Sequence, residues 1–157
     1  MVSECGLDWS DPAPFAPGTT LGATLLTPTR IYVRQLLETI RANRTAVKAL
    51  AHITGGGLIE NLPRVLPDSL AAVLDQSAFH LPPVFEWLQV EARLDDHEML
   101  RTFNCGIGMV VIVAESDVSS VLASLGPLGD EAILIGTLRA RDGDDAVRLE
   151  GKPWSAS

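Results

Sequence analysis

The sequence contains no apolar run of about 18 residues and no basic stretch followed by an apolar one, so we expect neither a membrane-spanning helix nor a signal peptide. Cysteine is also scarce, and the two residues present, Cys5 and Cys105, lie far apart and outside any CxxC pair. They do not make a disulfide framework, and free thiols fit a reducing compartment. Together these absences predict a cytoplasmic protein.

The chain has fewer positively charged residues than negatively charged ones. Lys and Arg number 12 against 20 Asp and Glu, which gives a formal net charge of -8. Nucleic acids and anionic membranes are bound through clustered Lys and Arg, so we expect this chain to bind neither. The three tryptophans do not alternate with basic residues, as they would on a surface for single-stranded nucleic acid. A small phosphorylated ligand is compatible with the charge, because it needs only a helix N-terminus and one Arg.

The chain has enough apolar residues for one folded domain. Its 157 residues are 46% hydrophobic and 20% charged, the balance of a packed globular protein. Residues 1–28 contain several prolines without an apolar period, which predicts an irregular arm lying over the surface. Residues 29–150 carry the periodic patterns and form the predicted domain, and residues 151–157 form a tail.

Several segments have the apolar spacing of helices. Apolar residues at i, i+3, i+4 and i+7 from Val33 predict an amphipathic helix with Thr29 as its N-cap. Helices are also predicted from Pro82-Pro83 and over Val118–Leu125, and a short helical segment is expected near Ala46–Lys48.

Other apolar runs have the length and composition of strands. These are Ala49–Ile53, Leu70–Leu74, Gly106–Ala114, Ala132–Leu138 and a closing edge strand that contains Val147 and Leu149. Because helices and strands interleave without a regular βαβ series, the order indicates an α+β fold in which helices cover a mixed sheet.

Three consecutive glycines, Gly55, Gly56 and Gly57, separate the first predicted strand from a segment that can open a helix. Bare backbone N–H groups at a helix start favour an anion such as phosphate. A tight turn packed on the core is the alternative. Neither a Walker A sequence nor GxGxxG spacing is present, so the glycines do not predict a named nucleotide-binding fold.

Polar residues flank the glycines. His52 and Thr54 are two residues apart, so strand alternation places both side chains on one face. A histidine there is either a hydrogen-bonded core residue or a group that contacts substrate or moves a proton. Asn61 and Arg64, which follow the glycines, offer an amide and a guanidinium to a ligand, or else act as a cap and a solvated surface residue.

A second glycine-bearing stretch contains Gly106 and Gly108 at the mouth of a predicted strand. Glycine weakens a strand unless a bulge or the close approach of a backbone or a ligand requires it. Asn104 adds an amide able to bind a polar ligand. Cys105 lacks a recognisable His/Asn partner set, which argues against a nucleophile.

The run Asp95-Asp-His-Glu98 has the composition of a metal cluster but the spacing of a helix start. Asp95 fits the N-cap and Glu98 the third helical position. His80 has no spaced partner and is predicted to be structural. We therefore predict no metal-binding residues in this chain.

Three stretches resemble a known family: LLTPTRIYV (residues 25–33), AHITGGGLIENLPRVLP (residues 51–67) and HEMLRTFNCGIGMVV (residues 97–111). Together they resemble the C-terminal domain of phosphoribosylformylglycinamidine cyclo-ligase, also called aminoimidazole ribonucleotide synthetase, over Leu7 to Glu150. Selenophosphate synthetase and thiamine-monophosphate kinase share the two-domain plan, but RTFNCGIGM together with TPTRIYV looks like the cyclo-ligase. The resemblance implies a three-layer α-β-α sandwich with a mixed β-sheet.

The resemblance also implies an enzyme of purine biosynthesis that uses ATP and Mg²⁺ to convert formylglycinamidine ribonucleotide to aminoimidazole ribonucleotide. ATP activates the formyl oxygen as a phosphate ester, and attack by a ring-forming nitrogen closes the imidazole and releases phosphate. In the family an N-terminal domain carries the ATP motifs and forms the homodimer, and the active site lies between the two domains. We expect that domain, and the Ser/Gly-rich strand and helix that begin the family's C-terminal domain, to lie outside this chain. The isolated chain is then expected to be inactive and to hold no cofactor of its own.

The resemblance makes His52 the catalytic candidate. The substrate-binding candidates are Thr54, Gly55, Gly56, Gly57, Asn61, Asn104 and Gly106. The residues leave one alternative open, a noncatalytic domain on the same scaffold that binds a small ligand or a partner.

Overall fold

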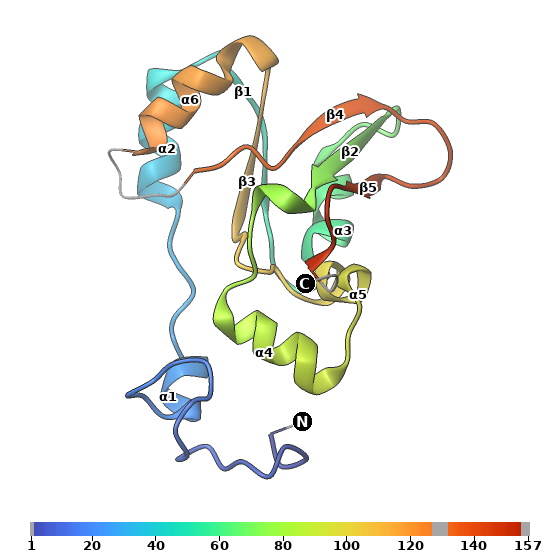
Figure 1. Ribbon diagram of the computed structural model, residues 1–157. Coiled ribbons are helices and arrows are strands. Elements are labelled where there is room, and N and C mark those ends of the chain that lie inside the picture. The colour runs from blue at the N-terminus through green and yellow to red at the C-terminus, as the bar shows by residue number, and fades with distance from the viewer. Residues whose placement is uncertain (1, 127–131, 155–157) are drawn as a thin grey trace.

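The computed structural model describes residues 2–126 and 132–154 and shows an α+β fold, as predicted (Figure 1). The α-helices are α1 (Leu21–Leu25), α2 (Val33–Ala42), α3 (Gly57–Asn61), α4 (Pro83–Ala92), α5 (Asp96–Thr102) and α6 (Val118–Leu125). The strands are β1 (Val47–His52), β2 (Leu70–Asp75), β3 (Met109–Val113), β4 (Gly136–Ala140) and β5 (Val147–Glu150). None of the helices in the described part of the chain has the length and apolar character needed to cross a bilayer.

The strands are divided between two sheets. β1 and β3 form an antiparallel pair in which His52 lies opposite Met109. The other sheet has the order β4-β2-β5, with β2 antiparallel to β4 and parallel to β5. The mixed sheet and the edge position of β5 are therefore confirmed. The division of the strands into two sheets leaves β3 and β4 each with a single neighbouring strand among the described residues.

The three predicted amphipathic helices, α2, α4 and α6, are present. α2 and α6 lie beside the β1–β3 pair, and Asn43 Nδ2 donates to Ser124 Oγ at 2.8 Å between them (Figure 1). The predicted cap of α2 is wrong, because the helix begins at Val33 and its N-cap is Tyr32, which makes no side-chain capping bond. Thr29 lies in the irregular segment before the helix, too far from its first turn to cap it.

Two predicted segment boundaries are also wrong. The segment near Ala46–Lys48 is not helical, because Val47 already pairs with Val113 in the β1–β3 ladder. Within Ala132–Leu138 only the part from Gly136 is a strand, since the pairing of β2 with β4 ends at Leu74 opposite Gly136. In both places the partner strand, and not local composition, sets the boundary.

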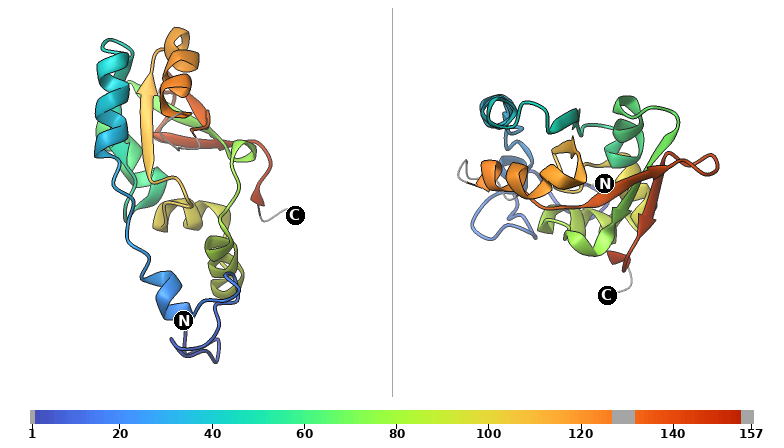
Figure 2. Two further views of the ribbon diagram at one scale, coloured as in Figure 1. Left: turned by 90° about the vertical axis from the view of Figure 1, so that its left-hand side faces the viewer. Right: turned by 90° about the horizontal axis from the view of Figure 1, so that it is seen from above.

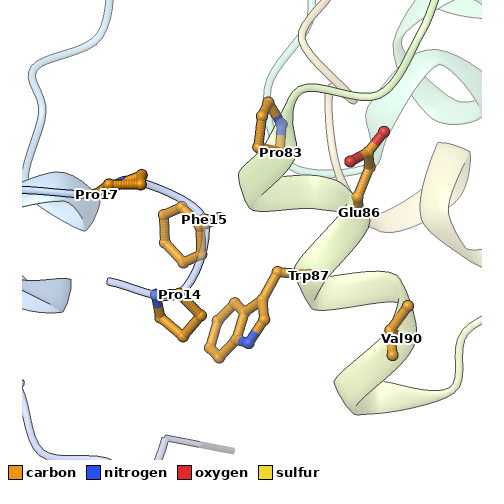
Figure 3. Close-up of a pocket in the computed structure, with 7 residues that line it drawn as sticks. All are labelled: Pro14, Phe15, Pro17, Pro83, Glu86, Trp87 and Val90. Atoms are coloured by element: carbon orange, nitrogen blue, oxygen red, sulfur yellow. The ribbon is translucent and has the colours of Figure 1, made fainter. Parts of the chain in front are cut away.

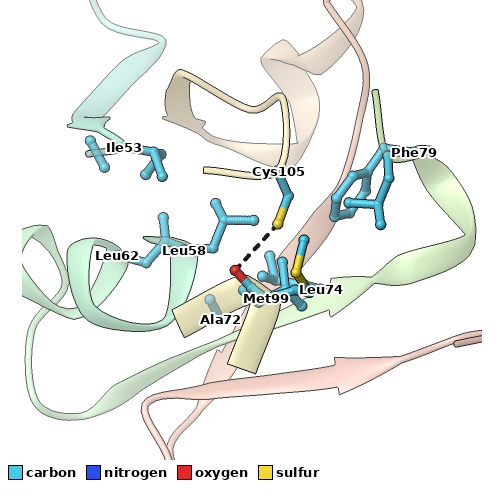
Figure 4. Close-up of a cluster of buried hydrophobic side chains, with 11 residues drawn as sticks. Ile53, Leu58, Leu62, Ala72, Leu74, Phe79, Met99 and Cys105 are labelled. Carbon is cyan, nitrogen blue, oxygen red and sulfur yellow. Dashed lines mark hydrogen bonds between the residues drawn. The ribbon is translucent and has the colours of Figure 1, made fainter. Parts of the chain in front are cut away.

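The main core lies between α3, α5 and β2. Its fully buried side chains include Ile53, Leu58, Met99, Leu100 and Cys105 (Figure 4). Each large apolar side chain buried in this way contributes roughly 1.5–3 kcal/mol of transfer free energy. The core therefore fixes the segments that carry both glycine-bearing stretches.

The N-terminal arm lies against α4. It consists mostly of turns, with the short helix α1, which was not predicted, starting after the N-cap Thr20. The ring of Phe15 packs on that of Trp87 at a centroid distance of 5.2 Å, beside a hollow of about 460 Å³ (Figure 3). The arm and α1 sit at the opposite end of the molecule from α2 and α6 (Figure 2).

The C-terminal segment is anchored on the core at Trp154. Its indole lies edge-on to Phe79 at 5.2 Å, and Nε1 donates to the carbonyls of Gln76 and Phe79. The Trp154 backbone N–H donates to the buried carboxylate of Asp96 at 2.7 Å.

Candidate functional site

The two glycine-bearing stretches, far apart in the sequence, meet where β1 ends and β3 begins. The backbone N–H of Ile53 donates to the Gly108 carbonyl at 3.0 Å, directly beyond the pair formed by His52 and Met109. The loop at Gly55–Gly57 therefore lies beside the loop that leads into β3. This junction is the candidate functional site.

The strand alternation predicted for His52 and Thr54 is confirmed. Both side chains are exposed, whereas Ile53 between them is 2% exposed and belongs to the core. His52 is thus not a buried core histidine.

Tyr32 and Arg30 extend this exposed face. The Tyr32 ring lies edge-on to the His52 ring at a centroid distance of 6.2 Å, and the Arg30 guanidinium carbon is 5.8 Å from the Tyr32 ring centroid. We call the group Arg30, Tyr32, His52, Thr54 and Gly55 the His52 surface. It combines an imidazole, two hydroxyls and a cation. Arg30 and Tyr32 were not among the predicted site residues, since they precede α2 in a segment without periodicity, and only their place in the motif TPTRIYV marked them.

Two of the three consecutive glycines are required by the protein's own packing. A Cβ on Gly57, whose φ is +54°, would collide with the Leu100 and Phe103 carbonyl oxygens of the α5 region. A Cβ on Gly56, at φ +93°, would lie 2.6 Å from the Glu60 carboxylate. Both φ values lie in the left-handed region, which also favours glycine. At Gly55 an added Cβ would meet open space, and this glycine is exposed on the His52 surface.

Asn61 holds the glycine loop from inside. Its side chain is 5% exposed, and Nδ2 donates to the carbonyls of Gly57 at 2.8 Å, Gly55 at 3.2 Å and Thr54 at 3.4 Å. Its Oδ1 accepts from Arg64 Nη1 at 3.2 Å. The structure therefore places Asn61 behind the loop, where its polar atoms are bonded within the protein.

Asn104 shapes the second loop in a similar way. Its Oδ1 accepts from the Gly106 N–H at 3.0 Å, and Gly106 takes a φ of +88°. A Cβ on Gly106 would lie 2.6 Å from the Pro82 ring, and one on Gly108 would collide with the Tyr32 hydroxyl. The sequence predicted that something approaches the backbone closely at Gly106 and Gly108. The Pro82 and Tyr32 side chains of the protein itself make that approach.

Cys105 has the environment of a structural thiol. It is fully buried, and its Sγ–H donates to the Met99 carbonyl at 3.4 Å (Figure 4). Burial, and to a lesser extent the Asp96 charge, raises the pKa of this thiol to about 12. A thiol that stays protonated at neutral pH is a poor nucleophile, in line with the sequence interpretation.

The acidic run at Asp95 is a helix start, as predicted. Asp95 is the N-cap of α5, and its Oδ1 accepts from the Glu98 N–H at 2.8 Å. The next carboxylate, Asp96, is 7% exposed and accepts from Gln76 Nε2 at 3.0 Å and Gln89 Nε2 at 2.7 Å. Within residues 2–126 and 132–154 we find no group of three or more His, Cys, Asp or Glu side chains that could hold a metal ion.

Comparison with known protein families gives a match over residues 4–148 to the AIR synthase related protein, C-terminal domain. The chain belongs to this family. Among solved structures it is similar to HypE of E. coli, a hydrogenase maturation protein, with 28% sequence identity and a TM-score of 0.59. The similarity covers 78% of this chain but 37% of HypE, so the chain spans little more than a third of that protein's length.

Proposed function

We propose that this chain supplies the substrate-facing wall of an ATP-dependent cyclo-ligase that converts formylglycinamidine ribonucleotide to aminoimidazole ribonucleotide. Membership of the AIR synthase related family and the three motif stretches support the proposal. The observation that carries it is the junction of the two glycine-bearing loops, which presents His52, Thr54 and the Gly55 backbone together on one exposed face.

Each group on the His52 surface has a role in this reaction. Ring closure requires a proton to leave the attacking nitrogen, and in this proposal the His52 imidazole accepts it. The Thr54 hydroxyl and the Gly55 N–H bind polar atoms of the substrate near the reacting end. Arg30 contributes positive charge beside Tyr32 for the substrate phosphate. The other predicted residues hold this face in place: Gly56, Gly57 and Asn61 behind the first loop, and Asn104 and Gly106 in the second.

In the described residues no group of three or more His, Cys, Asp or Glu side chains could hold a metal ion. We propose that ATP and Mg²⁺ are held by an N-terminal domain outside this chain and that the active site forms between the two. Under this proposal the chain is inactive alone, since half a cleft does not hold both reactants together. The complete enzyme is proposed to be a homodimer through that N-terminal domain and to act in purine biosynthesis.

The test is ATP-dependent imidazole formation from formylglycinamidine ribonucleotide. It is run on this chain alone, on the N-terminal domain of an established cyclo-ligase alone, and on the two mixed. We expect product only from the mixture. Absence of product from the mixture, with both parts folded by circular dichroism and associated by analytical ultracentrifugation, would contradict the cyclo-ligase assignment.

A second candidate function is a part in hydrogenase maturation, which the 28% identity to HypE favours. A chimera tests it directly. Here the matching C-terminal part of HypE is replaced by this chain, and hydrogenase activity is measured in cells that lack HypE. Activity in the chimera together with no imidazole formation in the first experiment would favour this candidate. Failure of both experiments with folded proteins would favour the noncatalytic binding domain.

A further inference from the structure

One face of α4 lines the hollow of about 460 Å³ that lies between this helix and the N-terminal arm (Figure 3). Four helix residues at the spacing i, i+3, i+4 and i+7, which places them on one face, take part: Pro83, Glu86, Trp87 and Val90. None of the ten residues of α4 is fully buried, and Val90 is 72% exposed. The helix therefore presents a largely apolar face that the arm covers only in part.

The arm forms the opposite wall with two prolines and an aromatic ring. Pro14 and Pro17 line the hollow, and the Phe15 ring packs on the Trp87 ring. A proline-bearing, irregular stretch of the chain thus already lies on this indole. Aromatic-lined grooves bind proline-rich segments in the polyproline II conformation, because such segments are ordered before they bind and lose little entropy.

The Trp87 indole also offers a hydrogen-bond donor. Among the residues that the structure describes, its Nε1–H donates to no protein acceptor, whereas Nε1 of Trp154 donates to two carbonyls. A proline-rich segment has carbonyl oxygens without internal partners, since polyproline II contains no hydrogen bonds of its own. Trp87 can therefore contribute both an apolar surface and a directed polar contact.

The surroundings of the hollow are acidic. Glu86 lines it, and Glu91 lies against the arm further along α4, where burial and then the Glu91 carboxylate raise the pKa of the Cys5 thiol. The arm and the helix, residues 2–28 and 83–92, contain no Lys or Arg, and the arm adds Asp8 and Asp11. Negative charge around an apolar hollow favours a partner that carries Lys or Arg beside its apolar residues and disfavours an acidic one.

We propose that the hollow between the arm and α4 is a docking site for a proline-rich segment of a partner protein, with Arg or Lys next to its prolines. The segment lies in the polyproline II conformation with its rings against Trp87, and one of its carbonyls accepts from the indole N–H. Its basic residues lie near Glu86 and Glu91. The residues that line the hollow lie outside the His52 surface, so this docking does not depend on the proposed reaction.

The probe is a fluorescein-labelled peptide of six prolines with two arginines at each end, measured by fluorescence polarisation against the chain at low ionic strength. Two control peptides have the same length: one has glutamates in place of the arginines, and the other has alternating glycine and serine in place of the prolines. We expect the proline–arginine peptide to bind at least tenfold more tightly than either control. No binding, or equal binding of either control, would overturn the proposal.

Two pairs of variants locate the bound peptide. Glu86→Lys reverses the charge of an exposed residue in the lining, and Trp87→Phe removes the indole N–H but keeps a ring to pack on Phe15. We expect binding at least fivefold weaker for Glu86→Lys and at least threefold weaker for Trp87→Phe. The matched controls, Glu150→Lys and Trp9→Phe, change exposed residues outside the lining and should leave the affinity unchanged.

Equal weakening by a variant and its control, with all four variants folded by circular dichroism, would contradict the hollow as the binding site. Analytical ultracentrifugation of the chain without peptide tests the remaining occupant. A monomer supports a docking site that is open to a partner. A dimer that Glu86→Lys dissociates would show that a second copy of this chain covers the hollow, and the proposal would be wrong.

Discussion

The short segment from His52 to Asn61 has two sides with different tasks. Ile53, Gly57 and Asn61 face inward and are held by the core, by α5 and by three loop carbonyls. His52 and Gly55 face outward and meet open space or the half-buried Tyr32 ring. A glycine-rich motif therefore does not indicate a ligand along its whole length. Its inward residues build the loop, and its outward ones are available for chemistry.

The largest expected effect on folding is on the inward side, at Gly57. Gly57→Ala places a Cβ against two backbone carbonyl oxygens at a positive φ, so we expect a loss of about 4 kcal/mol of unfolding free energy or failure to fold. Urea denaturation followed by circular dichroism measures it. The matched control is Gly55→Ala, where the added methyl meets open space, and a change within about 1 kcal/mol is expected. Equal losses at the two positions would remove the distinction between the sides.

The second largest loss of unfolding free energy should follow truncation of a core side chain beneath the glycine loop. Leu100 is fully buried on α5, so Leu100→Ala should lower the unfolding free energy by about 3 kcal/mol through lost burial and a cavity. The exposed Leu26 serves as the control, since Leu26→Ala should cost less than about 0.5 kcal/mol. A small cost at Leu100 would show that α5 does not support the glycine loop.

The helices were more predictable from sequence than the loops. α2, α4 and α6 follow from apolar spacing within single segments, which is local information. The residues that force glycine at positions 57, 106 and 108 come from α5, Pro82 and Tyr32, which only the fold brings to the loops. For the same reason the sequence did not show that β3 and β4 belong to separate sheets, because strand partners are set by tertiary packing.

The two loop asparagines, Asn61 and Asn104, should differ in how much they contribute to the unfolding free energy. Asn61→Ala removes the donor shared by three loop carbonyls, of which the Gly57 carbonyl is buried, so we expect a loss of about 2 kcal/mol. Asn104→Ala removes one hydrogen bond at a half-buried site and should cost about 1 kcal/mol. Urea midpoints of both variants test the order, and a larger loss at Asn104 would reverse the assignment of the inner support.

A smaller effect is expected from the Cys105 thiol as pH rises. Because its pKa is raised to about 12 in the folded protein, the unfolded chain loses this proton first, near its ordinary value of about 8.5. Its contribution to stability is therefore complete below that pH and declines as pH rises towards 12. The advantage of wild type over Cys105→Ala in unfolding free energy should shrink between pH 8 and 10. A constant difference across that range would contradict the raised pKa.

The central claim is that the outward side of this segment faces the substrate, and His52→Ala tests it most directly. Because His52 is exposed, the variant should change the unfolding free energy by less than about 0.5 kcal/mol. In the enzyme reconstituted with an N-terminal domain, kcat for aminoimidazole ribonucleotide formation should fall about 100-fold, the usual scale for loss of an acid–base group. Unchanged turnover in a folded His52→Ala variant would contradict the claim.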